Sequence, residues 1–420
     1  MDKTRIRVLW FEVTSPSRYD DKGLVVGGWQ DSLENIVRTI PEIELYIAFE
    51  GKNGDKKKTL DGVTYIPIIP QYKSLKDRFR LKYDTWGLYV DKLLPIAVDV
   101  VYDINPDIIH VFGSEWCWGL IAKFVPYPVV IHMQGSIPPY QNASYPPSYN
   151  FMDYILYNGL FINRDWAQYW NIRNNIKRAK MEETILGIVN NYMGRTDWDK
   201  GIVKLYNSNA DYYYCSEALR PEIINSTQKW TYNKEDKIKL ITIGCTSLLK
   251  GIDTILKTAK ILKEHNVDFE WILVGKLWIK DFLEYKEKIK FEDVNIKLTG
   301  FLGAEALTNL LIHSTMYIHT AYIDNSPNSV CEAQYLGVPV IATYVGGIPS
   351  LIDNGKDGFL IPVNDPFTLA NKIMYLSEDE NILKKISSEA IKKAVERHST
   401  ENIIHDLLTC YKSIISKYQK

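Results

Sequence analysis

The chain has 420 residues, 46% of them hydrophobic and 24% charged, and its formal net charge at pH 7 is −1. This length allows two domains of ordinary size, and the near-zero charge excludes the strongly basic balance typical of nucleic-acid-binding proteins. No stretch reaches the ~20 apolar residues of a membrane span. The apolar run that ends at Phe11 is too short for a signal-peptide core followed by a cleavage site. We therefore expect a cytoplasmic protein.

The cysteines are scattered along the chain and show no Cys-x-x-Cys spacing, which predicts neither a disulfide framework nor a zinc site. Buried free thiols are the state expected in a reducing compartment. The five positions are Cys117, Cys215, Cys245, Cys331 and Cys410.

Short apolar runs alternate with helical patterns along both halves of the chain, which predicts α/β domains with mainly parallel sheets. The strands expected in the first half are Ile6–Phe11, Ile43–Phe49, Val63–Ile69, Ile108–Phe112, Val129–Met133, Gly187–Val189 and Tyr212–Tyr214. Those expected in the second half are Leu240–Ile243, Trp271–Val274, Ile296–Thr299, Met316–His319, Val338–Ala342 and Phe359–Ile361. The expected helices include Trp29–Ile40, Ile252–Glu264, Ala304–Leu311 and Thr368–Leu376, with two more after Glu378.

The polar segment Thr231–Lys239 breaks this alternation and is the expected linker. It divides the chain into a first domain of residues 1–233, a second domain of residues 234–400 and a C-terminal helix of residues 401–420. Two doubly wound domains would place ligands at the carboxyl ends of their strands.

The most informative stretch runs from Asp324 to Pro366. Asp324 and Glu332 stand eight positions apart, a spacing of just over two helical turns, and the Pro-Asn-Ser turn between them predicts the start of a helix. The unpaired N–H groups of a helix start suit a phosphate. A strand and the turn Gly346-Gly347 follow and give a second backbone edge. Together these parts could hold a sugar attached to a diphosphate.

This stretch resembles the donor-binding segment of retaining glycosyltransferases of the GT-B fold, of the group 1 or family 4 type. Asp107–Glu115, Met193–Asp199 and Cys215–Arg220 resemble motifs of a bacterial subgroup that assembles surface polysaccharides such as capsule. The resemblance implies two Rossmann-like domains that face a cleft, the donor mainly on the second and the acceptor mainly on the first. It also implies that the C-terminal helix, Ile403–Tyr418, returns to the first domain.

The resemblance further implies a nucleotide-sugar donor, taken as UDP-linked, and a glycan or lipid-linked acceptor. No cofactor and no metal are expected, because enzymes of this fold generally need no metal, and we expect no Asp-x-Asp metal motif of the other glycosyltransferase fold.

In the family, the second carboxylate accepts hydrogen bonds from the ribose hydroxyls, which implies this role for Glu332. The first carboxylate binds hydroxyls of the donor sugar, which implies this role for Asp324, although the family more often has glutamate there. The N–H groups of Asn328, Ser329 and Val330 would face the distal phosphate. The alternatives are a cap or surface acid for Glu332, an Asx-type turn for Asp324 and an ordinary N-cap for the helix start.

Lys250 follows the strand Leu240–Ile243 and matches a lysine that clamps the diphosphate in the family. Cys245 stands where the family usually has a second clamp, an arginine. Arg195 or Arg220 could supply the missing charge, and a structural salt bridge is an equal alternative for either residue.

The resemblance places further candidates in the first domain. Gly27 and Gly28 lie between a strand and a helix, where glycine lets the backbone approach a phosphate or the acceptor, although a tight turn is the alternative. His132 and Gln134 end one strand on the same face, close to the transferred sugar in the family, or form part of the core. Glu115 could bind the acceptor or act as an acid–base group, or it could start a helix.

The stretch Lys73–Lys92 interleaves basic and aromatic residues. It could rest on an anionic membrane near a lipid-linked acceptor. A solvated helix face packed by aromatic rings is the preferred interpretation.

Three other functions stay open beside the glycosyltransferase. A GT-B epimerase or phosphorylase would share the fold, although a phosphorylase needs a lysine cofactor site that we do not find. A non-catalytic relative could bind a nucleotide sugar as an assembly partner. A nucleotide-binding oxidoreductase is disfavoured, because no Gly-x-Gly-x-x-Gly follows the first strand.

Overall fold

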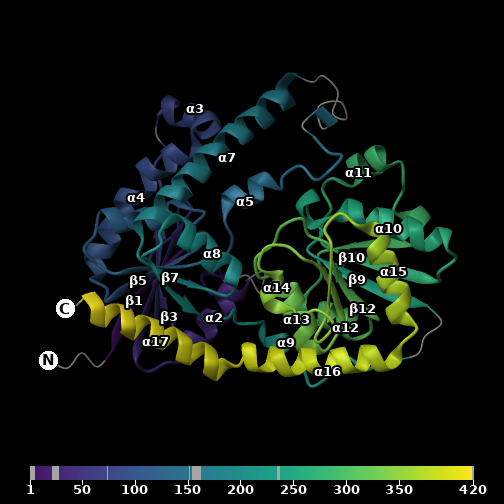
Figure 1. Cartoon of the computed structure of the whole chain (residues 1–420). Helices are drawn as coiled ribbons and strands as arrows, with labels where there is room; N and C mark the ends of the chain where they lie inside the picture. The colour runs from purple at the N-terminus through teal and green to yellow at the C-terminus, as the bar shows by residue number, and fades with distance from the viewer. Residues whose placement is uncertain are drawn as a thin grey trace. The chain divides into compact units, whose positions relative to one another are not determined.

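The computed structural model describes residues 5–20, 28–72, 74–150, 152–153, 162–233 and 237–418. Its internal contacts divide the chain into two compact units. Unit 1 comprises residues 1–138, 161–218 and 400–420, and unit 2 comprises residues 139–160 and 219–399. Figure 1 shows the helices and strands of both units with their labels.

Unit 1 is built on an eight-stranded sheet in the order β3-β4-β2-β1-β5-β6-β7-β8. Its neighbouring strands are parallel, apart from the antiparallel pair β3 and β4. The order reverses between β1 and β5, which makes the carboxyl ends of these strands a topological switch point. The strands are β1 Ile6–Glu12, β2 Ile43–Glu50, β3 Lys58–Leu60, β4 Val63–Ile68, β5 Ile108–Phe112, β6 Val129–His132, β7 Asn191–Gly194 and β8 Asp211–Tyr214.

Apolar residues of β1 alternate between the two faces of this sheet, so both faces are buried. Leu9 and Phe11 join a core with the longer helices of the unit, whereas Val8 and Trp10 join a second core with α2 and α17. The helical segments are α1 Ser17–Asp20, α2 Trp29–Val37, α3 Leu75–Tyr83, α4 Thr85–Ile104, η1 Cys117–Lys123, α7 Ile162–Ile188, α8 Asp197–Tyr206 and α17 Thr400–Tyr418. The helix α5, Ile137–Asn142, begins in unit 1 and ends in unit 2.

The C-terminal helix α17 is part of unit 1. Its buried Tyr411 hydroxyl accepts a hydrogen bond of 3.1 Å from Nε1 of Trp10 on β1. The same hydroxyl lies 2.6 Å from Nδ1 of His110 on β5. These contacts join the last helix to the first strand, and the expected return of the C-terminal helix to the first domain is confirmed.

Unit 2 has a six-stranded parallel sheet in the order β11-β10-β9-β12-β13-β14. The order reverses between β9 and β12, which is the switch point of a doubly wound sheet. The strands are β9 Ile238–Ile243, β10 Phe269–Val274, β11 Ile296–Gly300, β12 Met316–His319, β13 Val340–Thr343 and β14 Phe359–Ile361. The helical segments are α9 Pro221–Ile224, η2 Leu248–Lys250, α10 Ile252–Glu264, α11 Lys280–Glu287, η3 Glu292–Val294, α12 Ala304–Ile312, α13 Asn328–Leu336, α14 Ile348–Leu351, α15 Pro366–Ser377 and α16 Glu380–Arg397.

One predicted strand is wrong. Gly187–Val189 is the end of the long helix α7 and the turn after it, and the strand follows as β7. Val189 of this predicted strand is buried against the sheet, as are Ile185 and Leu186 directly before it on α7. A short apolar run does not distinguish a buried strand from the buried end of a helix.

The units divide the chain at residues 218 and 219, before the linker predicted from composition. Leu219, Ile223 and Trp230 are buried in the core of unit 2. The backbone N–H of Trp230 also donates to the carbonyl oxygen of Leu336 at 2.8 Å. This packing places residues 219–233 with unit 2. Residues 234–236 of the predicted linker lie outside the described residues.

Candidate functional site

Polar side chains of unit 2 meet around Asp324, at the carboxyl ends of β9 and β12. Nζ of Lys250 donates a hydrogen bond of 2.6 Å to Oδ2 of Asp324. Nε2 of His319, the last residue of β12, lies 3.2 Å from the same oxygen, without the alignment of a hydrogen bond. Oδ1 of Asp324 accepts from the N–H of Asn325 at 3.1 Å and from the hydroxyl of Tyr140 at 3.4 Å. Asp324 is therefore the centre of a buried polar cluster at the switch point of the sheet.

Two glycines allow backbone segments around this cluster to pack closely against one another. Gly251 follows Lys250 with φ +69°, and a Cβ at this position would lie 1.9 Å from the carbonyl oxygen of Thr320. Gly346 has φ +51°, and a Cβ there would lie 1.9 Å from the carbonyl oxygen of Asp324. Only glycine tolerates this conformation together with such close approach. The Gly346-Gly347 turn, which comes after α13 in the sequence, thus packs directly against the backbone of Asp324.

The charges of this cluster are set by burial and by Lys250. Burial is the largest single effect and disfavours a charged carboxylate at Asp324, but Lys250 and His319 together outweigh it and hold the pKa of Asp324 below its usual value. Burial lowers the pKa of His319, although Asp324 opposes this effect. At neutral pH the cluster therefore combines an ionised aspartate with a neutral histidine.

Glu332, on α13, is buried and lacks ordinary partners. Neither of its carboxylate oxygens accepts a hydrogen bond from a residue in the described part of the chain. Nε of Arg220, at the start of α9, lies 2.9 Å from Oε1 but without hydrogen-bond alignment. Burial raises the pKa of Glu332 to about 7, against the opposing charge of Arg220. Arg220 thus faces the glutamate, and the carboxylate keeps acceptor capacity that a ligand could use.

The start of α13 lies between the two carboxylates, as the sequence predicts. Asn328 and Ser329 are its first two residues, whose N–H groups have no carbonyl acceptor within the helix. The N–H of Val330 donates to the carbonyl oxygen of Pro327 at 3.0 Å, so it is already engaged in this structure. The hydroxyl of Ser329 accepts a hydrogen bond of 2.7 Å from Tyr317, which fixes this end of the helix to β12.

The side chain of Cys245 is buried in the core of unit 2. Its side chain is 1% exposed, and its thiol donates to the carbonyl oxygen of Thr242 at 3.6 Å. Burial raises the pKa of this thiol to about 12. The side chain at this position therefore contributes to packing of unit 2, and Lys250 is the cation that contacts Asp324.

Unit 1 brings several predicted residues to the carboxyl ends of β5, β6 and β7. His132 is fully buried between the rings of Trp29 and Phe112, and neither of its ring nitrogens has a hydrogen-bond partner among the described residues. Burial lowers the pKa of His132 well below its usual value. Gly28 is the N-cap of α2, with open space where a Cβ would stand. Gly27 lies outside the described residues.

Glu115 and Arg195 lie at the same edge of the unit 1 sheet. Arg195 is buried, donates to the carbonyl oxygen of Met133 at 3.2 Å and lies over the ring of Trp29, 4.6 Å from its centroid. Burial raises the pKa of Glu115, while Arg178 and then Arg195 act against it. Gln134 follows β6 at this edge and is half-buried. The residues predicted from four separate motifs therefore converge within unit 1.

Glu182 of α7 was not predicted as a site residue. Its carboxylate accepts hydrogen bonds from the Ser114 hydroxyl at 2.5 Å and from the Ile137 N–H at 2.6 Å. Burial and the nearby Glu115 raise its pKa to about 7. It stands between Met181 and Glu183 near the end of α7, and no local pattern distinguishes it from a surface acid.

One Asp-x-Asp sequence, Asp197-Trp198-Asp199, is present after all, and it has a structural role. Asp199 is fully buried, and its carboxylate accepts from the backbone N–H groups of Arg195 and Thr196. The Thr196 hydroxyl accepts from the N–H of Asp199 in return, which completes a capping box at the start of α8. The carboxylate of Asp199 is thus used to start a helix.

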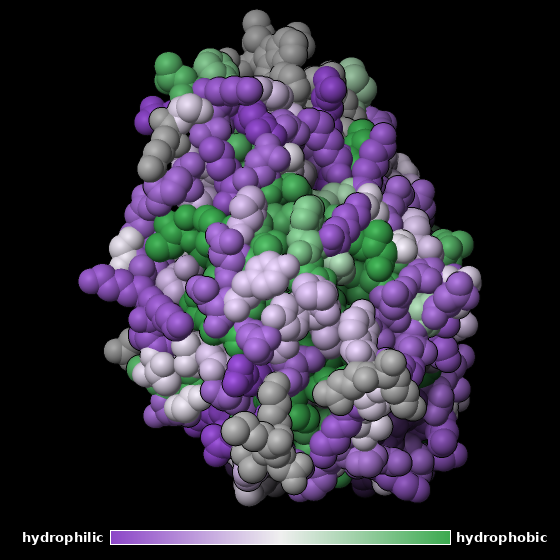
Figure 2. Space-filling model, turned by 90° about the vertical axis from the view of Figure 1, so that its left-hand side faces the viewer, coloured by the Kyte–Doolittle hydropathy of each residue, from purple (hydrophilic) through white to green (hydrophobic). Residues whose placement is uncertain are grey.

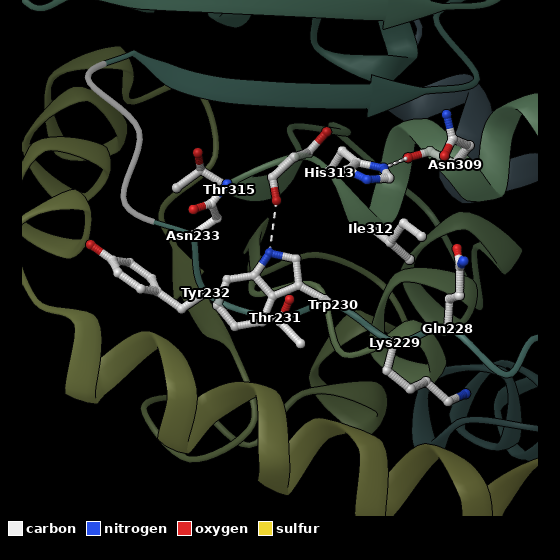
Figure 3. Close-up of a pocket in the computed structure, with 11 residues that line it drawn as sticks. Gln228, Lys229, Trp230, Thr231, Tyr232, Asn233, Asn309, Ile312, His313 and Thr315 are labelled. Carbon is white, nitrogen blue, oxygen red and sulfur yellow. Dashed lines mark hydrogen bonds between the residues drawn. The ribbon is translucent and has the colours of Figure 1, made fainter.

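A groove of about 570 Å³ lies at the opposite edge of the unit 2 sheet (Figure 3). Trp230, Tyr232 and Thr315 line it, and the indole of Trp230 donates to the carbonyl oxygen of Ser314 at 2.8 Å. This is the amino end of β12, whereas ligands of doubly wound sheets bind at the carboxyl ends. The cluster around Asp324 is therefore the candidate site of unit 2, and this groove is not.

Residues 225–393 match the family model of Glycosyl transferases group 1. This part of the chain belongs to unit 2 and contains Lys250, Asp324 and Glu332, so the family resemblance of the motif is confirmed. Over 185 residues the chain is 24% identical to the "Putative colanic acid biosynthesis glycosyltransferase WcaL" of Salmonella typhimurium (strain LT2), covering 42% of this chain and 45% of that protein. The chain spans about half the length of the curated relatives it matches.

Solved structures show the fold of the whole chain. Sucrose-phosphate synthase from Thermosynechococcus elongatus matches with a TM-score of 0.71 and 14% identity, over 98% of this chain and 100% of that chain. Anabaena Alr3699/HepE in complex with UDP and glucose matches with a TM-score of 0.66 and 14% identity, over 97% and 100%. These structural similarities, together with the doubly wound sheet in each unit, confirm the predicted GT-B fold class.

Proposed function

We propose that this chain is a retaining glycosyltransferase that moves a sugar from a UDP-linked donor to a glycan or lipid-linked acceptor in surface polysaccharide synthesis. The observation that carries the proposal is the pair of buried carboxylates at α13. Glu332 has two oxygens that accept no hydrogen bond from the described residues, and Asp324 forms a charge pair with Lys250. The family match at residues 225–393 and the colanic acid pathway in the name of one relative support the reaction class.

Each part of a nucleotide sugar has a matching group in unit 2. The ribose hydroxyls would donate to Glu332, whose buried carboxylate faces Arg220 and accepts no hydrogen bond from the described residues. The N–H groups of Asn328 and Ser329 and the Lys250 ammonium would bind the diphosphate. Asp324 would bind hydroxyls of the sugar. Along the chain, Asp324, the start of α13 and Glu332 follow one another in the order of sugar, diphosphate and ribose in the donor.

The chemistry then depends on stabilising charge on the leaving group. As the bond between the sugar carbon and the diphosphate oxygen breaks, its electron pair leaves with UDP, and the sugar becomes oxocarbenium-like. Lys250 and the start of α13 would stabilise the growing negative charge. The oxygen of the acceptor hydroxyl forms the new bond to the sugar carbon, and its proton passes to an acid–base group. We place Glu115, a half-buried carboxylate of unit 1, at the acceptor side as this acid–base group, with His132 and Arg195 as further candidates of the same unit.

This assignment needs no metal ion and no cofactor, since a lysine and a helix start supply the charge that a cation would otherwise bring. Transfer should therefore persist in EDTA. Complete loss of activity in EDTA, restored by magnesium or manganese, would contradict this part of the proposal.

We also propose a cytoplasmic location with peripheral contact to the membrane through α3. None of the helices in the described part of the chain is both long and apolar enough to cross a membrane. On the face shown in Figure 2, hydrophobic residues gather in places but are interrupted by hydrophilic ones. On α3, Leu75 and Phe79 are 73% and 66% exposed and stand one helical turn apart, beside the exposed Arg78 and Lys82. This combination suits the surface of an anionic bilayer, where a lipid-linked acceptor would lie.

Donor hydrolysis tests the proposed reaction without knowledge of the acceptor. A panel of UDP-sugars is incubated with the protein, and proton NMR records which sugar is released and its anomeric form before mutarotation. Release of the α-anomer from a UDP-α-sugar is expected. An epimerase would instead convert the sugar nucleotide without release, a phosphorylase would require inorganic phosphate, and a non-catalytic relative would bind the donor without turnover.

A further inference from the structure

A segment that lies between β6 and α7 in the chain is built into unit 2. Tyr149 is buried in the core of unit 2, its ring meets Phe282 edge-on at 5.9 Å, and its hydroxyl donates to Glu287 of α11. Asp153 forms an ion pair of 2.7 Å with Lys286 of the same helix. Figure 1 shows the chain running from α5 towards α11. These anchors fix the residues after α5 to the unit that carries the candidate donor site.

The anchored segment brings Tyr140, on α5, to the carboxylate of Asp324. An ionised carboxylate offers about four lone-pair positions. In this structure Lys250 and His319 flank Oδ2, while Asn325 N–H and Tyr140 donate to Oδ1. The bond from Tyr140 is the longest of the hydrogen bonds at Asp324, at 3.4 Å, and it comes from an uncharged donor. It is the weakest of them, because hydrogen bonds weaken with distance and charged donors bind more strongly.

We propose that Tyr140 is a positioning residue for the donor sugar and that it acts together with Asp324. A sugar hydroxyl that binds Oδ1 of Asp324 must replace one of the two donors at this oxygen, and the Tyr140 bond is the weaker of the two. A hydroxyl both donates and accepts. The sugar hydroxyl then donates to Asp324 while it accepts from the Tyr140 hydroxyl, so that both residues hold one group of the sugar. This inference rests on the proposed nucleotide-sugar site and adds to it a residue from outside the family-matched segment.

Tyr140→Phe tests this proposal, because it removes one hydroxyl and keeps the ring. Tyr145→Phe is the matched control, since Tyr145 lies in the same segment and is 39% exposed. UDP, UDP-glucose and UDP-N-acetylglucosamine are titrated calorimetrically into the wild type and both variants. For the UDP-sugar that the wild type prefers, Tyr140→Phe should lower the affinity by about two- to tenfold, the worth of one hydrogen bond between neutral groups. Its affinity for UDP should stay that of the wild type, which also shows that the variant is folded.

A double-mutant cycle with Asp324→Asn distinguishes a shared role from a separate one. If both residues hold one hydroxyl, the two substitutions together should weaken UDP-sugar binding by clearly less than the product of the single effects. Equal affinity of wild type and Tyr140→Phe for the UDP-sugar, or equal loss for UDP and the UDP-sugar, would overturn the role of Tyr140 while leaving the proposed function in place. Failure of the wild type to bind UDP and both UDP-sugars would overturn the proposed donor and this inference together.

Discussion

The ammonium of Lys250 lies 2.6 Å from a carboxylate oxygen of Asp324, although the two residues stand 74 positions apart in the chain. They meet because β9 and β12 are neighbours at the point where the strand order of unit 2 reverses. The cation that we assign to the diphosphate and the carboxylate that we assign to the sugar are therefore electrostatically coupled. When the donor binds, the Lys250 ammonium must therefore interact with both the Asp324 carboxylate and the phosphates.

Lys250→Ala should weaken binding of UDP far more than binding of uridine, because only the diphosphate can use the charge of the lysine. The substitution also leaves Asp324 without its cation, which should cost roughly 1–3 kcal/mol of folding free energy. Calorimetric titration and denaturant unfolding measure the two effects. Cys245→Ala is the control on the same loop and should leave UDP affinity unchanged. Equal weakening of UDP and uridine by Lys250→Ala would make the lysine a structural residue.

The raised pKa of Glu332 predicts a pH dependence of stability. Because its pKa is about 7 in the folded protein and 4.5 in the reference state, the native state binds more protons between these values. Stability conferred by the protonated form is present below about pH 4.5 and is lost as pH rises towards 7, by an amount on the order of 1–3 kcal/mol. Relative to the wild type, Glu332→Gln should therefore be more stable at pH 8 than at pH 5.

Thermal unfolding at these two pH values measures the difference for Glu332→Gln. Glu305→Gln, which changes an exposed carboxylate at the start of α12, is the matched control and should show little change between the two conditions. A difference for Glu332→Gln as small as that for the control would show that Glu332 titrates like an exposed carboxyl group.

Tyr411→Phe should destabilise unit 1, because it leaves the buried indole N–H of Trp10 without its acceptor. An unsatisfied buried donor costs about 1–3 kcal/mol. Denaturant unfolding of the full chain should show this loss. Tyr418→Phe, at the exposed end of the same helix, should unfold like the wild type. Equal stability of all three proteins would mean that the α17 contact to β1 contributes nothing measurable.

Membrane contact through α3 can be measured by sedimentation with vesicles. The wild type should bind vesicles that contain phosphatidylglycerol more than vesicles of phosphatidylcholine alone, and added salt should reduce the binding. Phe79→Ser should lower it severalfold, since it removes an exposed apolar ring. Phe367→Ser is the control, because Phe367 is 72% exposed on α15 of unit 2. Equal loss in both variants would exclude α3 as the contact.

The strands and the motif of the second half could be predicted because their signals are local. Met316–His319 and Ile108–Phe112 have the predicted bounds, since each is a short apolar run that turn residues or charges delimit. The spacing of Asp324 and Glu332 on either side of a helix start was likewise visible in the sequence. The end of α7 was misinterpreted because a buried helix end and a buried strand have the same composition.

The contacts that complete the site could not be predicted, because they are made between distant segments. Tyr140 reaches Asp324 across 184 positions, and the segment that carries it follows a strand of unit 1. The Asp-x-Asp sequence is an example of the opposite kind, in which a local pattern suggests a site but the tertiary structure gives the residue another role. It looks like a metal motif, yet Asp199 is used by backbone N–H groups and by a capping box. Only tertiary structure distinguishes a carboxylate that is satisfied internally from one that is available to a ligand.

The central claim is that unit 2 binds the donor nucleotide with Glu332 on its ribose. Calorimetric titration of UDP at pH 8 into the wild type and Glu332→Gln tests this most directly. The variant keeps the shape of the side chain and removes its charge, so UDP affinity should fall roughly tenfold to a hundredfold, the worth of hydrogen bonds to a charged acceptor. Unchanged UDP affinity in a folded Glu332→Gln variant would contradict the account.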